Sequence, residues 1–170
     1  EERMMLNITV KENGNVIGEY EALNDAVISS GYLSRIIDVT ASVDGGDVIT
    51  YHADGLIAAT PTGSTAYSMS AGGPVIDPSM KCVCLTPICS HSLAAKPILI
   101  GADKIIKLKA FSKKRTDIYL SVDGRKVTNI KPFTEIYITQ SKNAVKLVRI
   151  NDRSFYKTLS LKFRDARSSK

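Results

Sequence analysis

Apolar and polar residues alternate along most of this chain with a period of two, which places every second side chain on one face of a β-strand. Met4 to Val10 alternates in this way, Glu12-Asn13-Gly14 supplies turn chemistry, and Val16 to Tyr20 follows, so the start predicts a β-hairpin. Further strands are predicted at 35–43, 48–52, 105–111, 118–122, 135–139 and 145–150. Such short strands at regular spacing favour a mostly β, antiparallel, sandwich-like domain with one or two short helices over β–α–β units.

One segment departs from the strand pattern. Ser64 to Ala71 follows Pro61-Thr62-Gly63 and ends at Gly72-Gly73-Pro74, a helix start signal and a stop signal in the right order. A short helix is therefore predicted here. Its N-terminus would gather free backbone N–H groups among hydroxyls, which is a suitable place for a polar or anionic ligand.

Length and composition indicate one soluble domain. A chain of 170 residues can bury a core without disulfides, and its 44% hydrophobic and 24% charged residues are ordinary. No apolar run approaches the roughly 20 residues of a membrane-spanning helix, so no membrane association is expected. We expect a β domain over 1–153 and a basic segment over 154–170 that packs on a further domain. A start at Glu1, without a leader pattern, is typical of an excerpt from a longer chain.

The charge is uneven along the chain. Residues 1–100 hold 5 basic and 11 acidic side chains, whereas 101–170 hold 18 basic and 6 acidic ones. The basic half could face phosphates, but its Lys and Arg are spread over strand-like segments without an aromatic stacking motif. A solvated face is the favoured interpretation, and no nucleic-acid partner is expected.

The cysteines point to a reducing compartment. Cys82, Cys84 and Cys89 lie within eight residues of one another, and an odd number gives no self-contained disulfide framework. A zinc site is disfavoured because no CxxC pair accompanies His52 and His91. We therefore expect three buried thiols in a strand and a cytoplasmic protein.

The densest chemical signal runs from Asp54 to Pro74. An acid at a turn precedes a strand, a hydroxyl-rich loop and the predicted helix. Asp54 can accept hydrogen bonds from ribose or amide donors, and Tyr67 offers a flat face for a base. Capping of a strand–helix connection would explain the same hydroxyls, and from the residues alone both interpretations stay open.

This run resembles the Asp-Gly-Leu…Thr-Pro-Thr-Gly-Ser-Thr-Ala-Tyr…Ala-Gly-Gly-Pro signature of the NAD kinase family. Agreement continues at Glu2-Arg3-Met4 with Leu6, at 22–25 and at 85–93, and extends to about 155. The resemblance implies the C-terminal domain of an enzyme that phosphorylates the adenosine-ribose 2′-hydroxyl of NAD. The phosphoryl donor would be ATP or polyphosphate with a divalent metal such as Mg²⁺. Family members are commonly homodimers or homotetramers in which neighbours complete each other's sites.

The resemblance also implies site residues. Asn24 and Asp25 would hold the adenosine side, with Thr65 near the adenine, and Asp54 would accept from the nicotinamide end. The residues implied to line the dinucleotide pocket are Thr62, Ala66, Tyr67 and Ser70, with Cys89 and His91 beside it. Where the family usually has Glu next to the Asn, this chain has the shorter Asp25. No residue of the chain is implied to be a metal ligand.

The family's Gly-Gly-Asp-Gly motif does not occur in this sequence. Its Asp, in an N-terminal α/β domain, is thought to activate the attacking hydroxyl, whereas Asp44-Gly45-Gly46-Asp47 has another order and predicts a hairpin turn. We therefore expect no catalytic residue here, an inactive isolated chain, and a tail over 154–170 that returns to the N-terminal domain. Alternatives are a lipid-kinase-like β domain, acting on diacylglycerol or sphingosine, and a non-enzymatic dinucleotide-binding module.

Overall fold

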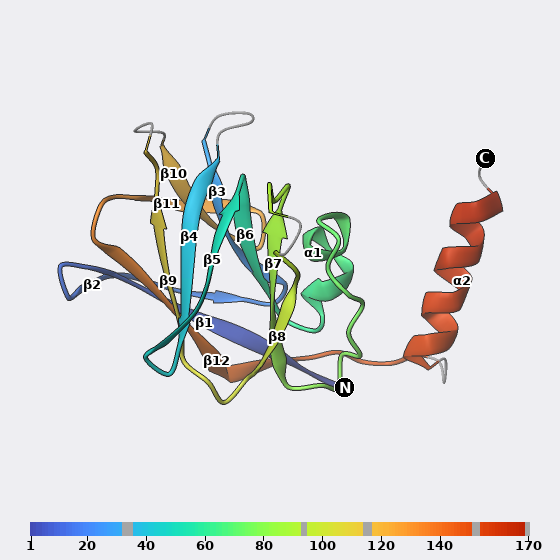
Figure 1. Cartoon of the computed structure of the whole chain (residues 1–170). Helices are drawn as coiled ribbons and strands as arrows, with labels where there is room; N and C mark the ends of the chain where they lie inside the picture. The colour runs from blue at the N-terminus through green and yellow to red at the C-terminus, as the bar shows by residue number, and fades with distance from the viewer. Residues whose placement is uncertain (32–35, 93–94, 114–116, 151–153, 169–170) are drawn as a thin grey trace.

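The computed structural model describes residues 1–31, 36–92, 95–113, 117–150 and 154–168. Over these residues the chain forms twelve strands in two six-stranded antiparallel sheets (Figure 1). The first sheet has the order β2 (Asn15–Ala22), β1 (Glu2–Glu12), β12 (Thr134–Lys146), β9 (Ile106–Phe111), β4 (Ile37–Val43), β5 (Gly46–Ala53). The second has the order β11 (Arg125–Ile130), β10 (Ile118–Val122), β3 (Asp25–Ser30), β6 (Gly55–Ala59), β7 (Cys82–Ile88), β8 (Ile98–Gly101).

The core lies between the two sheets because every second side chain of each strand turns inward. On β1, Leu6, Ile8 and Val10 are fully buried. They belong to one cluster with side chains of the second sheet such as Leu56 and Leu85. Removing this apolar surface from water is the main favourable contribution to folding. The predicted antiparallel β-sandwich is confirmed.

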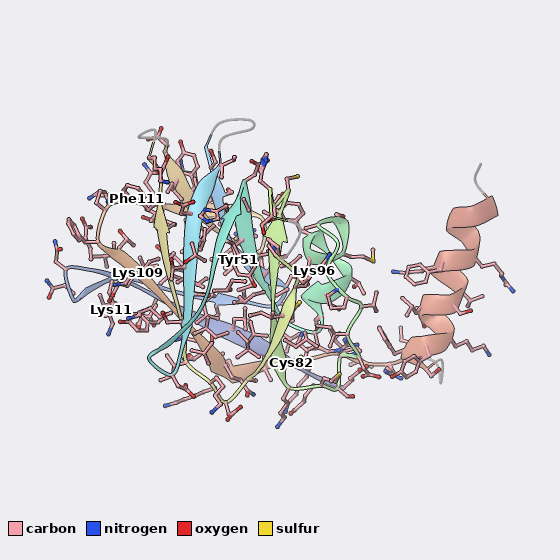
Figure 2. The ribbon with its side chains drawn as sticks, viewed as in Figure 1. Lys11, Tyr51, Cys82, Lys96, Lys109 and Phe111 are labelled. Atoms are coloured by element: carbon pink, nitrogen blue, oxygen red, sulfur yellow. The ribbon has the colours of Figure 1, made fainter. Side chains whose placement is uncertain are left out.

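Tyr51 on β5 is the largest fully buried side chain, and it points into the molecule near Lys96 (Figure 2). Its hydroxyl donates to the Lys96 carbonyl oxygen at 3.5 Å, near the limit for a hydrogen bond. Burial raises the pKa of Tyr51 to about 12, because the phenolate would lose its hydration. This phenol is therefore neutral at physiological pH.

The strand predicted at 145–150 is wrong. β12 continues through to Lys146, so the run predicted at 135–139 is part of the same strand, and 147–150 is not a strand. The polar stretch around Ser141 forms a bulge opposite Met4 and Leu6 of β1. The Ser141 hydroxyl donates to Glu21, and the Asn143 side-chain amide contacts the same carboxylate at 3.0 Å. These hydrogen bonds to Glu21 on β2 satisfy Ser141 and Asn143, so both polar residues can lie within the strand.

The short helix predicted over 64–71 is confirmed only over its second half. The segment forms a 3₁₀ turn, η1 (Gly63–Thr65), and one short α-helical turn, α1 (Tyr67–Ser70), separated by Ala66 at φ −96° and ψ −130°. A longer helix that was not predicted, α2 (Phe155–Ser168), follows the strands and lies beyond α1 (Figure 1). No helix within the described residues is long and apolar enough to span a membrane.

The loop that carries η1 and α1 covers the outer face of the second sheet. Val27, Ile57 and Ala59 pack there against Ala71 and Ile88. Cys82 and Cys84 are buried on β7 as expected, but Cys89 is exposed at φ +47° just beyond the strand, so that part of the cysteine prediction is wrong. The described residues contain no group of three or more His, Cys, Asp or Glu side chains suited to a metal ion.

Candidate functional site

A cavity of about 430 Å³ opens on the outer face of the second sheet, beside α1. It is lined by Asn24, Asp25, Val27, Ser29, Ala66, Tyr67, Ser121, Asp123 and Gly124. Four of these residues, Asn24, Asp25, Ala66 and Tyr67, are among those implied by the family resemblance. They come from two segments about 40 residues apart in the sequence. We call this cavity the Asp25 pocket.

The turn before β3 and the signature loop are held together by backbone contacts. The Thr60 hydroxyl donates to the Leu23 carbonyl oxygen at 2.6 Å, and the Thr60 N–H donates to the Asn24 carbonyl oxygen at 2.8 Å. The Gly63 N–H in turn donates to the Thr60 hydroxyl at 3.0 Å. A Cβ on Gly63 would lie 2.1 Å from the Asn24 carbonyl oxygen, so only glycine allows this approach. These contacts place Asn24 and Asp25 next to Ala66 and Tyr67.

Asp25 is the buried acidic group of this pocket. Its residue is 5% exposed, and burial together with the negative charge of Asp123 raises the pKa of its carboxyl group above the ordinary value. A ligand hydroxyl or amide that donates to this carboxylate would replace the hydration that burial removed. Tyr67, whose side chain is exposed, offers an aromatic face at the same pocket.

The hydroxyls of the signature loop fall into two groups. Ser64 and Ser68 are fully buried and structural: the Ser64 hydroxyl accepts from the Ile76 N–H at 3.0 Å, and the Ser68 hydroxyl lies 2.9 Å from that of Thr86. Thr62 and Thr65 instead line a second cavity of about 510 Å³. The buried hydroxyls therefore have structural partners, although neither helical turn has a side-chain cap, and Thr62 and Thr65 line a cavity.

The second cavity lies between the signature loop and α2. It is lined by Arg3, Pro61, Thr62, Thr65, Met69, Pro78, Leu147, Phe155, Thr158, Leu159, Lys162 and Phe163. Thr62 and Thr65 thus line this second cavity and are not among the residues that line the Asp25 pocket. Ser70 is exposed at the end of α1 and is not among the described residues that line either cavity.

Three predicted residues lie elsewhere. Asp54 precedes β6, whereas Asp25 pairs with Ala59 at the other end of that strand, about 16 Å away at 3.3 Å per residue. The Asp54 N–H donates to the Ile88 carbonyl oxygen at 3.0 Å, which places Asp54 at the same end of β7 as Cys89 and His91. The Asp54 Oδ1 atom is buried without a hydrogen-bond partner among the described residues. Asp54, Cys89 and His91 thus form a group at the opposite end of β6 and β7 from the Asp25 pocket.

The residues of the Asp25 pocket that the sequence did not indicate are Val27, Ser29, Ser121, Asp123 and Gly124. Asp123-Gly124 was recognisable only as a tight turn. Its place at the pocket follows from the pairing of β10 with β3, in which Val122 lies opposite Ala26. Strand alternation in β3 then puts Val27 and Ser29 on the same face as Asp25.

This arrangement defines a class of protein. An antiparallel β-sandwich whose outer face presents a buried carboxylate, an amide and an aromatic ring in one cavity is a domain suited to bind a nucleoside or nucleotide.

Comparison with known proteins identifies the family. Residues 23–150 match the ATP-NAD kinase C-terminal domain family, and the chain belongs to that family. It is 40% identical over 163 residues to an NAD kinase of Geobacter sulfurreducens, covering 96% of this chain and 57% of that protein. It is 43% identical over 161 residues to an NAD kinase of Clostridium beijerinckii, covering 95% of this chain and 56% of that protein. The chain therefore spans little more than half the length of these curated relatives.

Two solved structures are similar as well. Yeast NADH kinase complexed with NADH has a TM-score of 0.76 and 32% identity, with 83% of this chain and 41% of that chain covered. An NAD kinase from Archaeoglobus fulgidus in complex with ATP has a TM-score of 0.74 and 28% identity, with 96% of this chain and 61% of that chain covered.

Proposed function

We propose that this chain is the dinucleotide-binding domain of an NAD kinase, an enzyme that phosphorylates the adenosine-ribose 2′-hydroxyl of NAD to give NADP. The observation that carries the proposal is the Asp25 pocket, in which the signature loop and the Asn24–Asp25 turn meet. Membership in the NAD kinase family and the relatives named for NADH and ATP support it.

In this proposal the Asp25 pocket binds the adenosine part of NAD. The Asn24 and Asp25 side chains accept or donate hydrogen bonds at the ribose hydroxyls, and Tyr67 packs against the base. Because phosphoryl transfer depends mainly on positioning and electrostatics, the contribution of this chain is to fix the hydroxyl that reacts.

ATP or polyphosphate would supply the transferred phosphoryl group, and a divalent metal bound to that donor would neutralise the negative charge of the phosphates. The described residues present no cluster of three metal-ligating side chains, so no step is assigned to a metal held by this chain alone. Activation of the hydroxyl is assigned to a further α/β domain with the Gly-Gly-Asp-Gly motif. The isolated chain is accordingly expected to be inactive.

We assign Asp54 to the nicotinamide end of NAD. Its Oδ1 atom, buried without a partner among the described residues, is the acceptor that a carboxamide N–H requires. Since Asp54, Cys89 and His91 lie at the opposite end of β6 and β7 from the Asp25 pocket, they would serve the pocket of a neighbouring protomer. The proposal therefore includes a homodimer or homotetramer. It also places the protein in the cytoplasm.

The segment 154–170 is proposed to return to the further α/β domain. Phe155, Leu159 and Phe163 are spaced by four along α2 and line the second cavity together with Arg3 and Thr62. Apolar side chains at this spacing form one face of a helix, which a second domain could cover.

The proposal is tested by titrating the full-length protein with NAD and assaying conversion of NAD to NADP, with a diacylglycerol or sphingosine acceptor in parallel. Asp25→Ala should weaken NAD binding by about 1.5–3 kcal/mol, because ligand donors would lose a charged acceptor. Asp103→Ala, at an exposed acid that lines neither cavity, is the matched control and should bind as the wild type does. Phosphorylation of the lipid acceptor without binding of NAD would contradict the proposal.

A further inference from the structure

Three hairpin turns of this domain share one backbone conformation. Asn13-Gly14, Asp44-Gly45 and Asp123-Gly124 all have positive φ at both residues: 50° and 83°, 48° and 87°, 45° and 76°. Asn-Gly and Asp-Gly pairs favour such turns because Asn, Asp and Gly tolerate positive φ. All three turns therefore require the same backbone conformation, with positive φ at both residues.

The side chains of Asp44 and Asp123 make different contacts. The Asp44 carboxylate accepts from the Ile105 N–H at 3.0 Å and pairs with the Lys104 ammonium group at 2.9 Å, away from the Asp25 pocket. The Asp123 carboxylate instead accepts from three consecutive backbone N–H groups, those of Leu23 and Asn24 at 2.8 Å and that of Asp25 at 3.1 Å. The Asp123 N–H donates back to the Asp25 carbonyl oxygen at 3.0 Å.

The Asn24–Asp25 turn is thereby fixed from two sides. Thr60 holds the carbonyl oxygens of Leu23 and Asn24, and Asp123 holds the N–H groups of the same residues. Hydrogen bonds to an ionised acceptor are shorter and stronger than neutral ones. Asn13 and Asp44 form the same turn without contacting this segment, so the turn at Asp123 does not itself require the three contacts.

We propose that Asp123 is a positioning residue for NAD: its carboxylate fixes the backbone of the Asn24–Asp25 turn so that both side chains present their polar atoms to the Asp25 pocket. The inference rests on the proposed function, since it concerns the adenosine end of the same site. Preorganisation of this kind increases affinity because the turn loses less conformational freedom when the ligand binds.

The test compares two variants of Asp123 with the same changes at Asp44, in the full-length protein. Asp123→Asn keeps the size and turn preference but removes the charge, and Asp123→Gly relieves the positive φ while removing the carboxylate, which protects folding. Both should raise the Kd for NAD about tenfold, as expected for losing a charge-assisted hydrogen bond. Asp44→Asn and Asp44→Gly should leave the Kd within about twofold of the wild-type value.

A double-variant cycle separates positioning from a general loss of stability. Asn24→Ala alone should weaken NAD binding, and adding Asp123→Asn should then cost much less than it does in the wild type, because the two residues act as a unit. Additive losses, equal losses in the Asp44 variants, or wild-type affinity in Asp123→Gly would each overturn the inference. A wild-type protein that does not bind NAD would instead contradict the proposed function.

Discussion

The close contact between the signature loop and the Asn24–Asp25 turn can be tested by the substitution Gly63→Ala, which adds one methyl group. Adding a Cβ to Gly63 would place it 2.1 Å from the Asn24 carbonyl oxygen, 2.5 Å from its carbonyl carbon and 2.7 Å from its Cα. All three are backbone atoms, so no side-chain rotation can relieve the clash. Since Cβ atoms almost never approach within 3.0 Å of a neighbour, the two segments must separate by about 1 Å.

The cost of Gly63→Ala follows from the bonds that cross this contact. A shift of about 1 Å would stretch the bond from the Thr60 N–H to the Asn24 carbonyl oxygen, now 2.8 Å, beyond hydrogen-bond range. The bond from the Thr60 hydroxyl to the Leu23 carbonyl oxygen, now 2.6 Å, would weaken too. At about 1 kcal/mol for each bond, plus local strain, we expect the free energy of unfolding to fall by about 2–3 kcal/mol.

Urea unfolding followed by circular dichroism measures this loss, and NAD titration should show weaker binding because the Asp25 pocket opens. Gly46→Ala is the matched control: its Cβ would lie 3.7 Å from the nearest atom, an ordinary contact, and no positive φ is required there. We expect that variant to be as stable as the wild type or slightly more so. Equal stability of Gly63→Ala and Gly46→Ala would show that the two segments do not make this close contact.

Burial and the charge of Asp123 raise the pKa of the Asp25 carboxyl group, so the folded state binds the carboxyl proton more tightly than the unfolded chain does. The free energy of unfolding therefore falls as the pH rises through the raised pKa. Asp25→Asn should therefore be more stable than the wild type at neutral pH but not at acid pH, in urea unfolding, while binding NAD less well; a pH-independent difference would exclude this cause. For Tyr51 the same sign applies between pH 10 and about 12, so Tyr51→Phe should flatten the alkaline loss of stability followed by circular dichroism. If Asp54 serves a neighbouring protomer, mixing inactive Asp54→Ala and Asp25→Ala proteins should restore NAD phosphorylation in mixed oligomers, whereas no recovery would place both residues in one protomer's site.

Residue patterns along the chain were enough to predict the β-sandwich and the chemistry of the signature. Alternation in β1 is a local property, since a residue's face follows from its position in the strand. The Asn13-Gly14 and Asp123-Gly124 turns are equally local, because only a few residue types tolerate positive φ. The signature between Asp54 and Pro74 indicated the family for the same reason: its chemistry lies within one continuous segment.

Which of those residues lie together depends on how the strands pair. Strand pairing brings Asn24 and Asp25 beside the loop at Gly63, and it carries Asp123 to the same turn, although about 100 residues separate them. The same pairing sends Asp54 to the far end of β6, away from residues that are close to it in the sequence. Long-range register of this kind depends on the sum of many contacts across the sheet, and no short stretch of sequence contains it.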